Sequence, residues 1–140
     1  MARHAYTDHL KNVTLFSELT NKELDRVAQI ATQLDYAPGR VLMREGESAH
    51  EMFVVIEGTL DVTKDGEHIA DLGPGSFAGE MALLTHSHRS ATVSAKTDVS
   101  VLHIDGRGFT AVLRDVPQIA VKMLPVVAAR VVASSDNHEH

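Results

Sequence analysis

The sequence predicts a mainly β fold with flanking helices: a β jelly-roll barrel with one helix before it and two helices after it. Between Asp35 and Ile104, short β-type runs alternate with turn residues at intervals of roughly eight to twelve residues, as in sandwiches and barrels. On both sides of this region the apolar residues recur at helical spacing instead. We therefore expect a barrel over residues 35–104 that is enclosed by helices.

The expected N-terminal helix covers residues 20–34. Thr20 and Glu23 have the spacing of a capping box, in which each side chain accepts a hydrogen bond from the other residue's backbone. Apolar residues then recur at helical spacing, at Leu24, Val27, Ala28, Ile30, Ala31 and Leu34. This pattern predicts a helix of about four turns.

The clearest turn of the barrel region is Asp65-Gly66. It separates two β-type runs, residues 60–64 and 67–72, and both of its residues tolerate a positive φ. A two-residue turn of this kind predicts a tight hairpin. Further turn signals of the region are Pro38-Gly39, Glu45-Gly46, Glu57-Gly58, Gly73-Pro74-Gly75 and Asp105-Gly106.

Two C-terminal helices are expected over residues 108–135, followed by a polar tail at residues 136–140. The second helix, which Pro117 opens, is apolar on nearly every face, so we expect it to meet a second copy of itself in a homodimer. Pro125 opposes the helix, because proline removes an internal hydrogen bond. The polar breaks in this helix are Gln118, Lys122 and Arg130.

Composition limits the possible functions. The 140 residues predict a single domain, residues 1–140. The net charge is −6 and no run of Lys or Arg forms a basic patch, so we do not expect a nucleic-acid-binding protein. Neither a signal peptide nor an apolar run of ~18 residues is present, so we expect a soluble cytoplasmic protein without a membrane partner. The absence of cysteine excludes disulfides and thiolate catalysis.

Residues 77–92 place a glycine, an acid and an arginine around a short apolar turn. Gly79 lets the backbone approach a ligand, and the turn from Glu80 to Leu84 directs free N–H groups toward an anion. Arg89 adds a planar set of donors that matches phosphate. Glu80 would repel that anion, so we expect it to accept a hydrogen bond from a ribose hydroxyl and to balance Arg89. Together these residues predict a nucleotide site.

This segment resembles the phosphate-binding cassette of the cyclic-nucleotide-binding domain family. That cassette reads F-x-G-E-x-A-L and, nine residues after the acid, R-[S/T/A]-A-T-V, which here are Phe77–Leu83 and Arg89–Val93. The resemblance extends over nearly the whole chain and is closest to the bacterial catabolite-activator branch, although no DNA-binding domain follows. It implies the same barrel with flanking helices.

The resemblance also implies a role for each cassette residue. Gly79 and Ala91 would donate backbone N–H groups to the cyclic phosphate. Arg89 would contribute its guanidinium and Ser90 its hydroxyl, whereas Glu80 would bind the ribose 2′-hydroxyl.

The same resemblance extends the site to the sugar and to the base. Walls for the sugar would come from Phe77, Met81 and Ala82. On the last helix, Arg130 would face Glu80, while Ser134 and Ser135 would reach the adenine. We therefore expect Ser134 and Ser135 to form part of a lid over the base.

The function expected from this resemblance is that of a stand-alone regulatory or sensor domain. It would bind a cyclic purine mononucleotide, with cAMP as the expected ligand and cGMP left open by the hydroxyl of Ser90. No catalytic residue, metal or cofactor is expected. Ligand binding would shift the population of two states, which an unknown effector protein would distinguish.

Two alternatives remain. In the first, Glu80 and Arg89 form only a structural ion pair, in an interaction module of the same fold that does not bind nucleotide. An unpaired charge in a closed site is costly, so keeping both residues argues against this alternative. A cupin-like metal enzyme is suggested by His86-Ser87-His88, because alternate residues of a strand point the same way. It also requires a nearby glutamate and a later histidine in register, whereas here Arg89 follows at once and no glutamate occurs again until Glu139.

Overall fold

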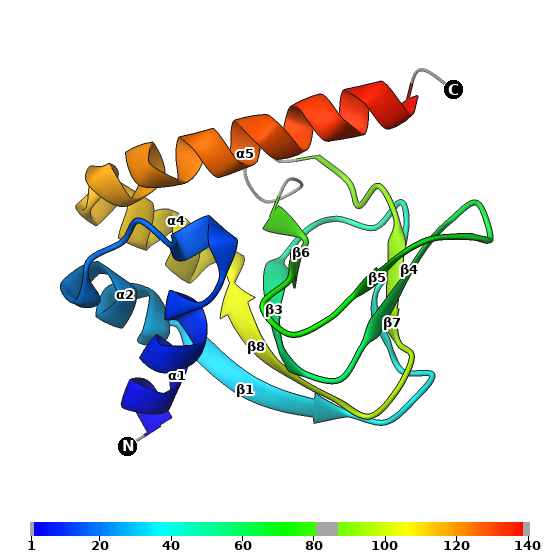
Figure 1. The fold of residues 1–140 in the computed structure, drawn as a ribbon, viewed down its shortest axis with the longest axis horizontal. Coiled ribbons are helices and arrows are strands. Elements are labelled where there is room, and N and C mark those ends of the chain that lie inside the picture. Colours follow the sequence, from blue (N-terminus) through cyan, green and yellow to red (C-terminus); the bar gives the residue numbers. More distant parts are fainter. Residues whose placement is uncertain (1, 81–86, 139–140) are drawn as a thin grey trace.

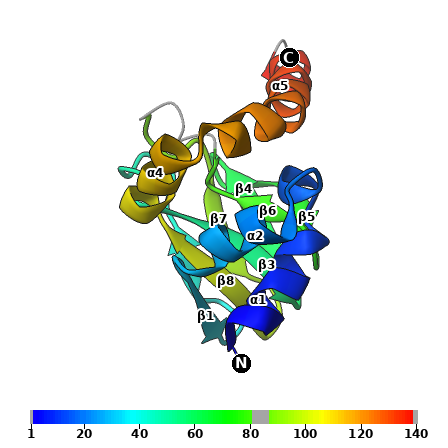
Figure 2. The ribbon, with the colours of Figure 1, turned by 90° about the vertical axis from the view of Figure 1, so that its left-hand side faces the viewer.

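The computed structural model describes residues 2–80 and 87–138, and it describes side chains for residues 6–80 and 87–130. Eight strands form two four-stranded sheets in which all the pairs are antiparallel. Helices α1, α2 and α4 lie beside one sheet, and α5 crosses one end of the molecule (Figure 1). The view in Figure 2, turned by 90°, keeps α5 at this end.

One sheet faces the helices, and the other lies across an apolar layer from it. The first has the order β1(Ala31–Tyr36), β8(Val99–Asp105), β3(Glu51–Glu57), β6(Phe77–Ala78). The second has the order β2(Val41–Met43), β7(Thr92–Ala95), β4(Leu60–Lys64), β5(Glu67–Leu72). The predicted mainly β jelly-roll fold with flanking helices is confirmed, with the described strands in two sheets and not in a closed barrel.

Strand β3 is buried on both faces, and it therefore belongs to both parts of the core. Phe53 and Val55 point into the layer between the sheets. Met52 and Val54 point the other way, into the layer under the helices. This double burial explains why β3 has an unbroken apolar run, because a strand covered on both sides does not need polar residues at alternate positions.

The N-terminal helix is shorter than predicted. Its capping box is confirmed, since Glu23 N–H donates to Thr20 Oγ1 at 3.2 Å and Thr20 N–H donates to Glu23 Oε1 at 2.8 Å. The helix α2 runs only from Asn21 to Ala28, however, and β1 begins at Ala31. The prediction of a helix over 20–34 was wrong because residues 31–36 pair along their whole length with β8, and this ladder outweighs the helical spacing of Ala31 and Leu34.

The hairpin at Asp65-Gly66 is confirmed. Asp65 has a φ of 53° and Gly66 a φ of 81°, and the turn joins β4 to β5. The sequence analysis missed two elements that precede the predicted helix: α1(Ala2–Lys11) and a 3₁₀ turn, η1(Thr14–Phe16).

The C-terminal helices are α4(Gly106–Asp115) and α5(Pro117–His138). Pro125 lies inside α5 without ending it. The helix α5 continues past residue 135, so most of the expected tail at 136–140 is helical instead. Ile119 and Met123 pack the first turns of α5 against the core, and adding residues to a helix that is already formed is favourable. Within the described part of the chain, no helix is long and apolar enough to cross a bilayer.

Candidate functional site

Arg89 is the most deeply enclosed cation among the described side chains, with 4% of its surface exposed. Its Nη1 donates to the backbone carbonyl of Gly79 at 3.0 Å, and its Nη2 donates to the backbone carbonyl of Glu51. The Oε2 of Glu51 lies 3.3 Å from Nη2. The backbone of Arg89 is fixed as well, because its N–H donates to the carbonyl of Glu47 at 2.8 Å. The guanidinium is thus held between the start of β3 and the end of β6.

Glu51 is a site residue that sequence reasoning missed. We expected Glu80 to balance Arg89, but in the structure the carboxylate in contact with Arg89 belongs to Glu51, at the start of β3. Glu80 still acts on Arg89 as a nearby charge that raises its pKa, while its Oε2 contacts Arg130 on the last helix. Sequence gives little indication of the Glu51 contact, because 38 residues separate it from Arg89 and only the folded sheet brings them together.

Within the described part of the chain, the guanidinium of Arg89 does not use all of its donors. An arginine has five N–H groups, and the contacts to Gly79 and Glu51 use at most three of them. Burial lowers the pKa of Arg89, and the nearby carboxylates, Glu51 first, act in the opposite direction. An arginine stays charged at neutral pH even so. A buried cation with unused donors favours an anion beside it.

Gly79 is a glycine for a geometric reason. Its φ is +94°, a conformation that other residues rarely adopt. A Cβ at this position would lie 2.6 Å from Nη1 of Arg89 and 3.0 Å from the carbonyl oxygen of Glu51. Any side chain here would displace the arginine, so Gly79 and Arg89 depend on each other.

Glu80 pairs with α5. Only 2% of Glu80 is exposed, and its Oε2 lies 3.1 Å from Nη1 of Arg130. The other end of that guanidinium donates from Nη2 to the carbonyl of Phe77 at 3.2 Å, and the group stacks over the Phe77 ring at 4.3 Å. The contact that the sequence led us to expect between Arg130 and Glu80 is present, and it fastens α5 to the end of β6.

The other expected site residues differ in what the structure describes. Ser90 is exposed and Ala91 is half-buried, directly after Arg89. Outside the described residues or side chains lie Met81, Ala82, Ser134 and Ser135. The roles of all of them in ligand binding stay predictions.

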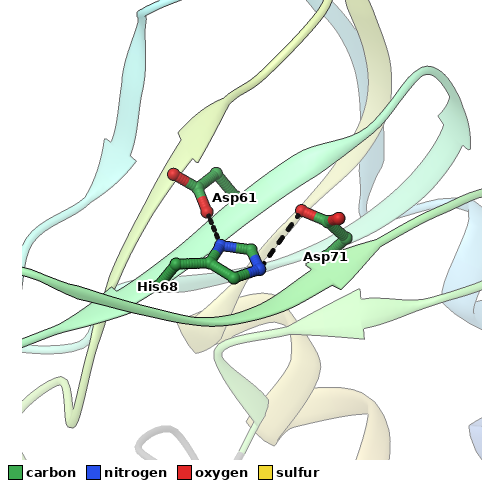
Figure 3. Close-up of side chains that lie close together, drawn as sticks. All are labelled: Asp61, His68 and Asp71. Atoms are coloured by element: carbon green, nitrogen blue, oxygen red, sulfur yellow. Dashed lines mark hydrogen bonds and ion pairs between the residues drawn. The ribbon is translucent and has the colours of Figure 1, made fainter.

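A second polar cluster lies on the hairpin β4–β5 (Figure 3). The ring of His68 lies between two carboxylates, with Nδ1 2.5 Å from Oδ1 of Asp61 and Nε2 3.8 Å from Oδ1 of Asp71. Lys96 also contacts Asp71, at 3.2 Å, so a metal ion here would have to compete with an ammonium group. The sequence did not point to this cluster, since the hairpin register alone places Asp61 opposite Asp71.

Comparisons with known proteins show the family of this chain. The family model described as "Cyclic nucleotide-binding domain" matches residues 33–115, more than half of the chain. A cAMP-dependent protein kinase regulatory subunit from Yarrowia lipolytica is 36% identical over 113 residues, which cover 79% of this chain and 30% of that protein. The chain therefore spans less than a third of the length of this relative.

Two solved structures have a similar fold. The regulatory subunit of a cAMP-independent protein kinase A from Trypanosoma brucei has a TM-score of 0.81 and 26% identity, and covers 92% of this chain and 45% of that one. A variant of that subunit with three substitutions, one of them threonine to arginine, is described as bound to cAMP. The N-terminal domain of a transcriptional regulator from Streptomyces coelicolor has a TM-score of 0.77 and 28% identity, covering 92% of this chain and 96% of that one.

Proposed function

Because this chain belongs to the cyclic nucleotide-binding domain family, we propose that it binds a cyclic purine mononucleotide, cAMP, beside Arg89. The observation that carries the proposal is the buried guanidinium of Arg89, which has unused donors next to Gly79. One phosphate oxygen could take the free N–H groups of Arg89. Each charge-assisted hydrogen bond of this kind contributes roughly 1.5–3 kcal/mol.

The ribose would be recognised by Glu80. A carboxylate that is nearly excluded from water, and already balanced by Arg130, can accept a hydrogen bond from a 2′-hydroxyl without bringing an uncompensated charge next to the phosphate. Met81, Ala82 and Phe77 complete the proposed wall around the sugar. Through Arg130 the same carboxylate contacts α5, on which Ser134 and Ser135 are proposed to approach the base.

The base preference is proposed as adenine, with guanine as the alternative. Ser90 directly follows Arg89 and is exposed, so its hydroxyl is accessible to a ligand. A hydroxyl at this place can assist either the phosphate or a guanine edge, and the comparison of cAMP with cGMP decides between them.

In this proposal the domain is a regulatory module and not an enzyme. Binding would move the segment that carries Glu80, and the ion pair to Arg130 would pass the movement to α5, whose position an effector protein would read. The catabolite-activator branch, a stand-alone sensor role and a cytoplasmic location are the finer parts of the proposal. Similarity to the N-terminal domain of a transcriptional regulator supports the first of these.

A nucleotide-independent module of the same fold is the second candidate. It is favoured by the similarity to a kinase subunit that is described as cAMP-independent. A variant of the same subunit is described as bound to cAMP, and this chain has the buried guanidinium of Arg89. We therefore retain nucleotide binding as the main proposal.

A homodimer through α5 is also proposed. Val121 and Leu124 are 63% and 59% exposed, and Pro125 and Ala128 are exposed on the same face, at helical spacing. The opposite face is used already, because Ile119 and Met123 are buried against the core. An apolar stripe left open on a helix gains stability when a second copy covers it.

The experiment that tests the function is a calorimetric titration of the protein with cAMP, cGMP and 5′-AMP. A cyclic nucleotide should bind, and 5′-AMP should bind more weakly, because its phosphate carries an additional charge and no ring to fit beside Arg89. Failure of both cyclic nucleotides to bind would favour the nucleotide-independent module.

A further inference from the structure

A cavity of about 510 Å³ lies outside the proposed nucleotide site, between one face of α4 and the segments that precede β3 and Arg89. Its volume falls in the range of small-molecule sites. Arg89, Gly79 and Glu51 do not line it. The walls are Ser48–His50, Ser87–His88 and the α4 face formed by Arg107, Thr110, Ala111 and Arg114, with Asp105 and Gly106 at the start of that helix.

The walls of this cavity are fastened to one another. The N–H of Gly106 donates to the carbonyl of His50 at 2.8 Å, which joins the start of α4 to the segment before β3. Ser48 and His88 form a β-bridge, which joins that segment to the one before Arg89. The cavity is therefore built from three chain segments that hold a defined arrangement.

Two arginines line this cavity in a chain whose net charge is −6. Arg107 and Arg114 line the cavity from one face of α4, and His50 and His88 line it from the other wall. Among the described residues neither arginine has an ion-pair partner, whereas Arg26, Arg89 and Arg130 all have one.

One acid lines the cavity as well, but it is already engaged. Asp105 caps α4, because its Oδ2 accepts a hydrogen bond from the N–H of Gly108 at 3.0 Å. Among the described residues its carboxylate forms no ion pair with either arginine. The lining therefore carries two arginines against one carboxylate, an excess of positive charge.

We propose that this cavity is a second ligand site, for a small polyanion that carries at least two phosphate groups. Two turns of helix separate Arg107 from Arg114, about 10 Å along the axis. An extended polyphosphate can span this distance and take bidentate hydrogen bonds from each guanidinium group without either side chain folding toward the other. Thr110, one turn after Arg107, adds a hydroxyl between them.

The test is a calorimetric titration with sodium tripolyphosphate, pyrophosphate and orthophosphate at constant ionic strength, with and without saturating cAMP. Affinity should rise with the number of phosphate groups, and cAMP should not abolish it. Backbone amide shifts should change at Ser48, Thr110 and Ala111. Because this readout uses the unmodified protein, it does not depend on whether a variant folds or on whether cAMP binds.

Arg107→Gln and Arg114→Gln should each weaken tripolyphosphate binding at least about tenfold, the loss expected when one charge-assisted hydrogen bond is removed. The matched control is Arg40→Gln, which removes the same charge from the turn before β2, outside the cavity. An equal loss in Arg40→Gln would mean general attraction by charge and would overturn the site. The site would also be overturned if amide shifts were confined to Gly79 and Arg89 and vanished when cAMP was added. Equal affinities for tripolyphosphate, pyrophosphate and orthophosphate would overturn it as well.

Discussion

Glu80 and Arg130 form an ion pair across 3.1 Å that links the end of β6 to α5, with Glu80 almost completely buried. A buried carboxylate that loses its partner becomes costly, so the position of α5 and the charge of Glu80 depend on each other. In the proposed function, this pair is the route by which a nucleotide bound at Glu80 would act on the last helix.

Glu80→Gln should weaken cAMP binding less than any change that removes Arg89, and should change binding of 2′-deoxy-cAMP very little. The deoxy ligand lacks the hydroxyl that is proposed to donate a hydrogen bond to the carboxylate, so the change of ligand serves as one arm of a double-mutant cycle. Calorimetric titration of both proteins with both ligands measures the four affinities of this cycle.

Arg130→Gln is the matched control, because it breaks the same ion pair and leaves the carboxylate in place. It should lower the affinities for cAMP and 2′-deoxy-cAMP by the same factor. If Glu80→Gln also lowers both affinities equally, Glu80 acts through α5 and not on the sugar.

Glu51→Gln should destabilise the free protein more than the nucleotide-bound protein. The carboxylate of Glu51 is the described counter-charge in contact with Arg89, and the phosphate of a bound ligand would replace it. The increase in unfolding temperature on adding saturating cAMP should therefore be larger in Glu51→Gln than in the parent. An unchanged increase would show that phosphate does not take over this role.

Acid should weaken the attachment of α5 to α2. Lys122 donates to Glu23 at 2.6 Å, and this bond, together with the backbone N–H of Thr20, holds the pKa of Glu23 below its ordinary value of 4.5. A carboxyl group whose pKa is lowered on folding contributes stability at a pH above its ordinary pKa. That contribution is lost as the pH falls through the lower pKa of the folded state.

Urea unfolding at pH 7 and pH 3 should thus show a smaller acid-induced loss of stability in Glu23→Gln than in the parent. Glu18 is exposed, so Glu18→Gln serves as the control and should lose as much stability between pH 7 and pH 3 as the parent. The pH dependence would have another origin if Glu23→Gln and the parent lost equal stability.

Leu124→Glu should convert the proposed dimer into a monomer, because an ionised side chain is expensive to bury without a partner. Ile69→Glu is a suitable control, since Ile69 is another exposed apolar residue, on β5. Val127 packs against the core beneath α5, so a charge there would test folding instead. Sedimentation of the parent as a monomer at tens of micromolar would remove the dimer proposal.

Features with a local cause could be predicted from the sequence. The capping box of Thr20 and Glu23 and the hairpin at Asp65-Gly66 involve residues at most three apart, so short patterns predict them. The end of α2 could not be predicted, because it depends on the pairing of β1 with β8, about 70 residues further on in the chain. Local propensity and tertiary pairing disagree at this point.

The candidate site follows the same division. The cassette motif identified Gly79, Glu80 and Arg89, whose spacing in the sequence is fixed. The partner of Arg89 was missed, because no local pattern connects Glu51 with it. Arg130 was placed by alignment on the helix that Pro117 opens, and its contact with Glu80 is seen in the structure.

The central claim is that Arg89 holds the phosphate of a cyclic nucleotide. Its most direct test is the affinity for cAMP of the parent and of Arg89→Ala, measured by calorimetry, with far-UV circular dichroism to confirm that both are folded. We predict a loss of roughly 3 kcal/mol or more, over a hundredfold, because at least two charge-assisted hydrogen bonds disappear. An affinity within threefold of the parent in a folded variant would contradict the claim.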